Sequence, residues 1–123
     1  MTVLPQFDCH RISLTAAATL GAYTRVKLTT SGTVDVAGVT DTSIGYLTER
    51  GSVSGALCTV QLHGLPFNAI AAGAIEVGDI CWSAASGKVN DVDAGSGKIV
   101  GIAYTAAAAD TDCLTLFRPD YVA

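Results

Sequence analysis

The chain has two histidines, His10 and His63, and they are its only candidates for a neutral general base. A histidine that takes a proton from a nearby hydroxyl or thiol activates that group for attack on a carbonyl. Cys9 or Ser52 could supply the nucleophile, because catalytic triads are assembled in space. No local motif supports this, since residues 51–55, Gly-Ser-Val-Ser-Gly, have Val where a nucleophile elbow needs Ser. A small β-barrel hydrolase or protease-like enzyme using His63 is therefore only the alternative, and no catalytic residue is expected.

The four cysteines, Cys9, Cys58, Cys81 and Cys113, are separated by 49, 23 and 32 residues. No Cys-x-x-Cys pair occurs, so the spacing matches neither a zinc ribbon nor a thioredoxin-type redox site. Cys58 and Cys113 lie in apolar, alternating segments, where a free cysteine packs as a small apolar side chain. We therefore expect buried free thiols and no bound metal.

A segment rich in Gly and Asp at residues 91–98 has the composition of an ion-binding or phosphate-binding loop, but not the spacing. In an EF-hand alignment Ser96 takes the place of the required glycine and Ile102 that of the bidentate glutamate. Residues 95–98, Gly-Ser-Gly-Lys, lack the upstream glycine and the following Ser or Thr of a P-loop. The sequence predicts a turn stabilised by aspartate side chains, with no cofactor and no small-molecule substrate.

Charge and hydropathy argue against other classes of function. The chain has 7 Lys and Arg against 11 Asp and Glu, a net charge of −4 and an isoelectric point near 4.8, so nucleic-acid binding is disfavoured. No apolar run approaches the roughly 18 residues of a membrane helix, and residues 2–6 do not resemble the start of a signal peptide. We expect a chain made in the cytoplasm without membrane contact.

Half of its residues are hydrophobic and the mean hydropathy is +0.43, which favours assembly with other chains.

Two stretches about 55 residues apart are nearly the same. Each has an Ala-rich lead-in, a Ser-Gly turn, a glycine within an apolar segment and a cysteine. These elements are found at residues 16–20 and 71–75, 31–34 and 86–89, Gly45 and Gly101, and Cys58 and Cys113. The chain is therefore predicted to hold two copies of one supersecondary unit, at about residues 13–66 and 67–120. Two copies are too few for a self-stacking array, so the halves must pack on each other or on a partner.

Alternating polar and apolar residues predict short β-strands in both halves, separated by Gly-containing turns. Residues 103–109 are expected to form a turn or at most one helical loop. A glycine inside a strand usually marks a bulge or the close approach of another backbone, so Gly45 and Gly101 predict the same bend made twice. The predicted fold class is all-β: a small β-sandwich or barrel (β-tulip-like) with little helix, forming one domain over residues 13–123. The expected strands are residues 23–29, 33–36, 43–48, 57–62, 79–83, 88–92, 98–104 and 113–117.

Residues 1–12 lie outside the repeat and are predicted to form an extended N-terminal arm. Such a leader is often unstructured, but this one is apolar enough to pack on a partner, so an ordered and a disordered arm both stay open. Large aromatic side chains among many small residues act as anchors, either in a core or at an interface. The side chains expected to contact a partner chain or another copy are Val3, Leu4, Pro5, Phe7, Ile12, Phe67 and Trp82, with Tyr46 and Phe117 as further anchors.

The second half resembles the tailed-bacteriophage capsid decoration proteins, also called head or capsid cement proteins. Four motifs carry the resemblance, in order: residues 71–80 with Gly78-Asp79, residues 84–89 ending in Gly-Lys-Val, residues 99–103 ending in Gly-Ile-Ala, and an Ala-rich turn before the last strand. The resemblance covers residues 56–118, and residues 13–55 more loosely through the duplication. The chain departs from the family at residues 81–82, Cys-Trp in place of the more usual Val-Tyr, and in having its own arm.

The resemblance implies a non-enzymatic structural protein of the virion, made in the cytoplasm of an infected bacterium. It implies binding to the outer surface of the mature phage head, often as a homotrimer, and stabilisation of contacts between major capsid protein subunits. The partners would be the major capsid protein and further copies of the chain, contacted through the arm and the apolar side chains named above. A tail or baseplate structural module stays open, since one fold can serve both places.

Overall fold

The computed structural model describes residues 11–62 and 66–116, which form ten β-strands and one short 3-10 turn. The predicted all-β class with little helix is confirmed. The first half holds β1 Arg11–Thr15, β2 Arg25–Leu28, β3 Val34–Val36, β4 Gly45–Leu47 and β5 Leu57–Leu62. The second half holds β6 Phe67–Ile70, β7 Ile80–Ser83, the 3-10 turn η1 Ala85–Gly87, β8 Val89–Asn90, β9 Ile99–Ala103 and β10 Asp112–Leu116.

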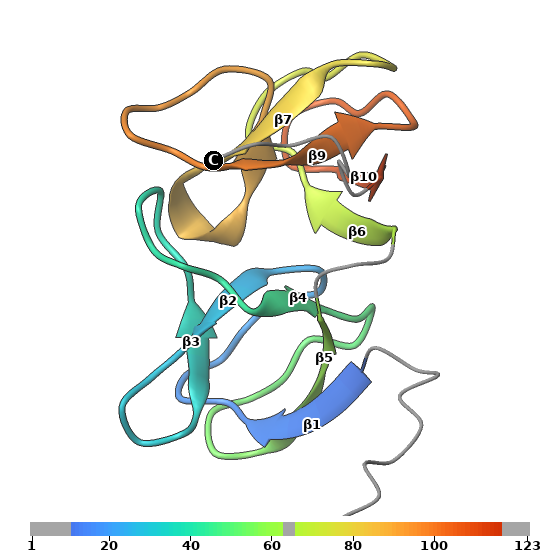
Figure 1. Ribbon diagram of the computed structural model, residues 1–123. Coiled ribbons are helices and arrows are strands. Elements are labelled where there is room, and N and C mark those ends of the chain that lie inside the picture. Colours follow the sequence, from blue (N-terminus) through green and yellow to red (C-terminus); the bar gives the residue numbers. More distant parts are fainter. Residues whose placement is uncertain (1–10, 63–65, 117–123) are drawn as a thin grey trace, which may run out of the picture.

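Each half folds into its own five-stranded antiparallel sheet, and the two sheets have the same strand order. The orders are β1-β5-β4-β2-β3 and β6-β10-β9-β7-β8. The residue after the first strand also pairs in parallel with the third strand, Ala16 with Val34 and Ala71 with Val89. Because this pairing joins the two edge strands, each sheet closes on itself. The molecule is therefore two small barrels, the first below and the second above in Figure 1.

The two halves match residue by residue at an offset of 55 or 56. Gly45 of β4 lies opposite Val26 of β2, and Gly101 of β9 lies opposite Cys81 of β7. The prediction of two related halves is thus confirmed down to single residue pairs. Antiparallel bridges outside the strands repeat in the same way, Leu20 with Ser52 and Ile75 with Ala107.

Each barrel has its own hydrophobic core. Alanine occupies the position where the end of the first strand meets the third strand, because only a small side chain fits between two such close backbones. The first core contains Ala16, Leu20, Val26, Val34, Leu47, Cys58 and Val60. The second contains Phe67, Ala69, Ala71, Ile75, Cys81, Val89, Ala103 and Cys113, together with Tyr46 from the first barrel.

The glycine within β4 marks a close contact, which is one of the two features predicted for Gly45 and Gly101. A Cβ on Gly45 would overlap the carbonyl oxygen of Gln61 on β5, so β4 and β5 meet at a distance that only glycine permits. Opposite Gly101, the register of β7 shifts between Cys81 and Trp82. The first barrel therefore has a close approach of two backbones at Gly45. In the second barrel, Gly101 lies beside a register shift of the neighbouring strand.

The alternation pattern does not predict β1 and β6, which are equivalent strands of the two halves. The buried positions of β6 include Ala69, and alanine gives a weak strand signal. β1 begins at Arg11, so Ile12 is a strand residue that packs against the first core, although the sequence places it at the end of the arm. The rest of the predicted arm, residues 1–10, lies outside the described residues.

Candidate interaction surfaces

The side chains considered for catalysis are not brought together in the part of the chain that the structure describes. Cys9, His10 and His63 lie outside the described residues. Ser52 is half-buried, pairs with Leu20, and donates its hydroxyl hydrogen to the carbonyl of its neighbour Val53 at 3.1 Å. Among residues 11–62 and 66–116, no group of three or more His, Cys, Asp or Glu could hold a metal ion. No helix in these same residues is long and apolar enough to cross a membrane.

Three cysteines, Cys58, Cys81 and Cys113, are buried free thiols, as predicted, and Cys9 lies outside the described residues. Burial raises the pKa of each, to about 12 for Cys81. A thiol with a raised pKa stays protonated at neutral pH and is a poor nucleophile. These cysteines therefore act as core side chains.

Two features of the described surface that could suggest a small-molecule site are chemically plain. One of about 270 Å³ lies between Leu20 and Val36, and Asp35 is the one charged residue in its lining among the described residues. The Gly- and Asp-rich segment is a turn, as predicted: the Asp93 carboxylate accepts hydrogen bonds from the backbone N–H groups of Gly95 at 2.9 Å and Gly97 at 2.8 Å. These features offer no convergent acid, base or nucleophile.

The contact between the two barrels, called the seam here, is centred on an aromatic pair. The rings of Tyr46 on β4 and Phe67 on β6 stack with centroids 3.9 Å apart and an interplanar angle of 12°. Both residues are at most 3% exposed. Phe67, which the sequence analysis expects at an outer contact, is therefore buried within the chain, where it anchors one barrel to the other.

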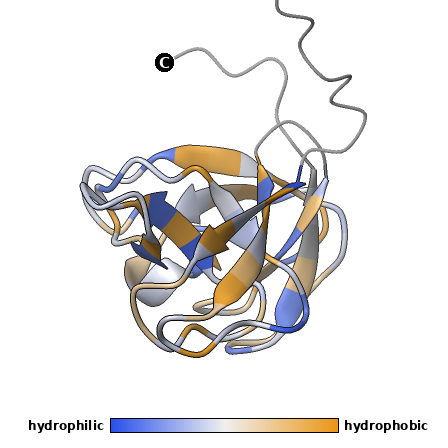
Figure 2. Cartoon of the chain, turned by 90° about the horizontal axis from the view of Figure 1, so that it is seen from below, coloured by the Kyte–Doolittle hydropathy of each residue, from blue (hydrophilic) through white to orange (hydrophobic). Residues whose placement is uncertain are grey.

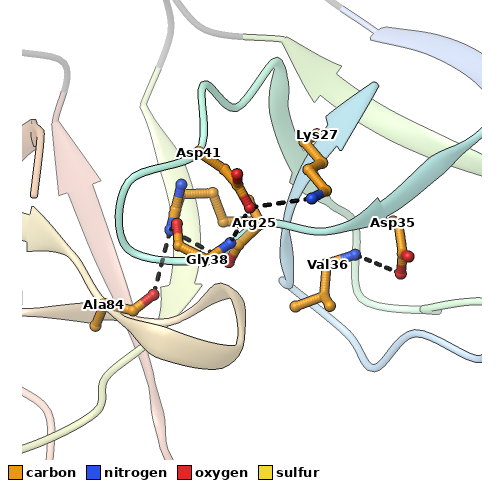
Figure 3. Close-up of polar contacts among 8 residues, drawn as sticks. Arg25, Lys27, Asp35, Val36, Gly38, Asp41 and Ala84 are labelled. Atoms are coloured by element: carbon orange, nitrogen blue, oxygen red, sulfur yellow. Dashed lines mark hydrogen bonds and ion pairs between the residues drawn. The ribbon is translucent and has the colours of Figure 1, made fainter. Parts of the chain in front are cut away.

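A buried arginine forms the polar part of the seam. The Nη2 group of Arg25 on β2 donates to the carbonyls of Ala37 at 3.3 Å and Gly38 at 2.7 Å in the first barrel, and of Ala84 at 3.2 Å in the second. Figure 3 shows the side chain reaching across to Ala84. Burial lowers the pKa of the guanidinium from its ordinary value, while the Tyr46 and Asp41 side chains oppose that shift.

The η1 turn of the second barrel inserts into the seam. The backbone N–H of Gly87 donates to the carbonyl of Ala37 at 3.0 Å, and the Ser83 hydroxyl donates to the carbonyl of Val39 at 2.6 Å. Gly87 has a φ of +71°, and a Cβ there would lie 2.6 Å from Thr24 Cγ2 and 2.9 Å from the Arg25 carbonyl oxygen. The two barrels are thus in direct van der Waals contact, with hydrogen bonds fixing their register.

The predicted outer contacts divide into those that the structure places and those that it does not. Trp82 on β7 is half-buried. Val3, Leu4, Pro5, Phe7 and Phe117 lie outside the described residues. The sequence reasoning missed other large apolar side chains that are exposed on the barrels, and Figure 2 shows hydrophobic segments alternating with hydrophilic ones around them. They are Leu28, Val36, Val53, Leu57, Val77, Ile80, Val92 and Tyr104.

Arg25 was also missed as a contact residue, because an arginine in an alternating strand is ordinarily exposed to solvent. One signal was present: its counterpart 55 residues later is Ile80, so this position changes from charged to apolar between two otherwise similar strands.

Comparisons with known proteins give a likeness in fold. No protein-family model matches the sequence, and no curated protein matches it. The structure is similar to the head fiber gp8.5 N base of bacteriophage phi29, with a TM-score of 0.73 and 17% sequence identity. The match covers 92% of this chain and 97% of that chain. The two-barrel fold of this protein is therefore similar, over almost its whole length, to the fold of a phage head fiber base.

Proposed function

We propose that this chain is a structural protein of a tailed-phage head, a decoration or cement protein that binds the outer surface of the mature capsid. It stabilises contacts between subunits of the major capsid protein and acts as an assembly of several copies. The observation that carries the proposal is the near-complete match, over both barrels, to a phage head fiber base. The sequence resemblance to capsid decoration proteins, which rests on different evidence, points the same way.

The described residues support a binding role over an enzymatic one. Their thiols are buried, and large apolar side chains are exposed on the barrels. A protein that binds only the expanded lattice stabilises that lattice by mass action. Many identical sites on one shell make a modest affinity per copy sufficient.

The test is co-sedimentation with expanded, DNA-free capsids assembled from the major capsid protein of the same phage. The chain is expected to pellet with expanded capsids at a saturating ratio and to raise the temperature at which they break open. A chain that stays in the supernatant at concentrations far above those of the capsid sites would overturn the proposal. Binding to purified tails in place of capsids would assign the chain to a tail or baseplate.

The arm supplies the second part of this test. Deleting residues 1–10 removes Val3, Leu4, Pro5 and Phe7 but leaves β1, which begins at Arg11. We expect the deletion to weaken capsid binding by about tenfold or more, since several apolar contacts are lost. The thermal unfolding temperature of the free protein serves as the control and should not change. Unchanged capsid affinity would remove the arm from the interface.

A further inference from the structure

The seam joins two different surfaces, one from each barrel. The first barrel contributes what we call the receiving face, made of Arg25, Ala37 and Tyr46, which are each at most 1% exposed. The second barrel contributes the docking tip, made of Phe67, Ser83, Ala84 and Gly87, which are all buried. Because the halves are equivalent, each barrel has residues at the positions of both surfaces. Within the chain, only the receiving face of the first barrel and the docking tip of the second are in contact.

The unused receiving face lies on the second barrel, at Ile80, Val92 and Ile102. Ile80 pairs with Ile102 on neighbouring strands, as Arg25 pairs with Tyr46 in the first barrel. The second version is apolar yet open to solvent: Ile80 is 38% and Val92 58% exposed, and Ile102 is half-buried.

The unused docking tip lies on the first barrel, at Ile12, Leu28, Thr29 and Gly32. Leu28 is 52% exposed, although its counterpart Ser83 is fully buried in the seam. Gly32 has a φ of +81°, close to the +71° of Gly87, but a Cβ on Gly32 would meet nothing within 4 Å. The same turn conformation is therefore in tight contact in one barrel and free in the other.

Three of the eight exposed large apolar side chains, Leu28, Ile80 and Val92, thus stand at positions that are buried in the seam of the other barrel. In Figure 1, β7 lies at the upper end of the molecule and the loop joining β2 to β3 at the lower end. The two unused surfaces therefore lie at opposite ends of the molecule, so they do not cover each other within one chain.

We propose that copies of this chain associate head to tail. The unused docking tip on the first barrel of one copy binds the unused receiving face on the second barrel of the next copy. This contact repeats the one by which the second barrel docks on the first within a single chain. The occupant of each unused surface is a second copy of the chain, because the chain already contains the complementary surface on the same framework. Such a contact joins unlike patches, so it extends to further copies and forms a ring where the rotation closes. The inference deepens the proposed function, whose assembly of several copies it assigns to named surfaces.

Two substitutions break one surface each. Val92→Asp places a charge on the receiving face and Leu28→Asp places one on the docking tip, both at exposed positions. Each variant alone is expected to be monomeric by sedimentation velocity. In an equimolar mixture the Val92→Asp variant keeps its docking tip and the Leu28→Asp variant keeps its receiving face. The mixture should therefore form dimers containing one copy of each variant, and nothing larger. Val53→Asp, at a 63% exposed valine outside both surfaces, should assemble like the wild type.

Several outcomes would overturn the head-to-tail contact. These are a wild-type chain that is monomeric, a variant that assembles like the wild type, a mixture that stays monomeric, or a single variant that dimerises on its own. Loss of capsid binding in either variant with no change in its oligomeric state would assign that surface to the capsid. A thermal melt of each variant shows that it is folded. Capsid co-sedimentation is scored separately, so a monomeric wild type that still binds capsids would reject this inference and leave the proposed function standing.

Discussion

The two barrels share their framework but differ in what covers the outer side of their second and fourth strands. In the first barrel this surface carries Arg25 and Tyr46 and is buried against the second barrel. In the second barrel the equivalent pair is Ile80 and Ile102, and the surface is open to solvent. A position that changes from charged to apolar between the copies is therefore one that meets a different neighbour in each barrel.

Core positions behave in the opposite way. Cys58 and Cys113 are buried in both barrels, and the parallel bridges of Ala16 and Ala71 repeat without change. Other core positions change in size, as where Leu47 of the first core corresponds to Ala103 of the second, so the same framework is filled by different side chains. The comparison indicates that the duplicated unit keeps its core positions apolar or small, whereas charge is gained or lost on its outside, which is the part available to partners.

The largest expected effect comes from removing the aromatic anchor of the seam. Phe67→Ala should lower the free energy of unfolding by about 3–5 kcal/mol, because it leaves a cavity and ends the stacking on Tyr46. Its counterpart Ile12 is half-buried, so Ile12→Ala should cost about 1–2 kcal/mol. Urea unfolding in the Val92→Asp background measures both without a contribution from assembly. Equal losses in the two variants would contradict the account of the seam.

A pair of glycine substitutions separates backbone strain from contact across the seam. Gly32→Ala places a side chain at positive φ in open space and should cost about 1 kcal/mol. Gly87→Ala adds the overlap with Thr24 and the Arg25 carbonyl, so about 2–4 kcal/mol is expected in total. The measurement is the difference between the two urea midpoints in the same background. A difference near zero would mean that the seam opens at little cost.

The sequence predicts the interior of this protein better than its contacts. Alternation and turns locate eight of the ten strands, and β5 has the predicted bounds, Leu57–Leu62. Of the two strands that were missed, β1 and β6, β6 places alanine at a buried position, where propensity carries little signal. The seam could not be predicted from spacing, because an arginine in an alternating strand is ordinarily exposed, and Phe67 fits a core as well as an interface until the packing of the two barrels is known.

The smallest effect concerns the loop that follows β3 in the first barrel. The Asp41 carboxylate stabilises this loop: it accepts a hydrogen bond from the backbone N–H of Gly38 at 2.8 Å and forms an ion pair with the Lys27 ammonium group at 3.2 Å. The hydrogen bond from Gly38, followed by that from Lys27, lowers the pKa of Asp41 below its ordinary 3.8. A carboxyl group whose pKa is lower in the folded than in the unfolded state adds stability above the unfolded pKa. That stability is lost as the pH falls through the folded pKa.

Asp41→Asn should therefore be less stable than the wild type above a pH of about 5, and the difference should shrink below a pH of about 4. Asp35→Asn, at a neighbouring aspartate, is the control for a general change in net charge. Chemical denaturation across this pH range measures both variants. A wild-type advantage that persists unchanged in acid would contradict the role given to the Asp41 carboxylate.

The central claim is that the contact between the barrels within one chain is repeated between chains. An electron cryomicroscopy map of the assembled wild-type protein tests it most directly, because the arrangement of successive barrels can be read from the map. The account predicts that the rotation and translation from the first to the second barrel of one copy also relate that second barrel to the first barrel of the next copy. A two-fold contact between identical patches, or one that leaves Leu28, Ile80 and Val92 exposed, would contradict it.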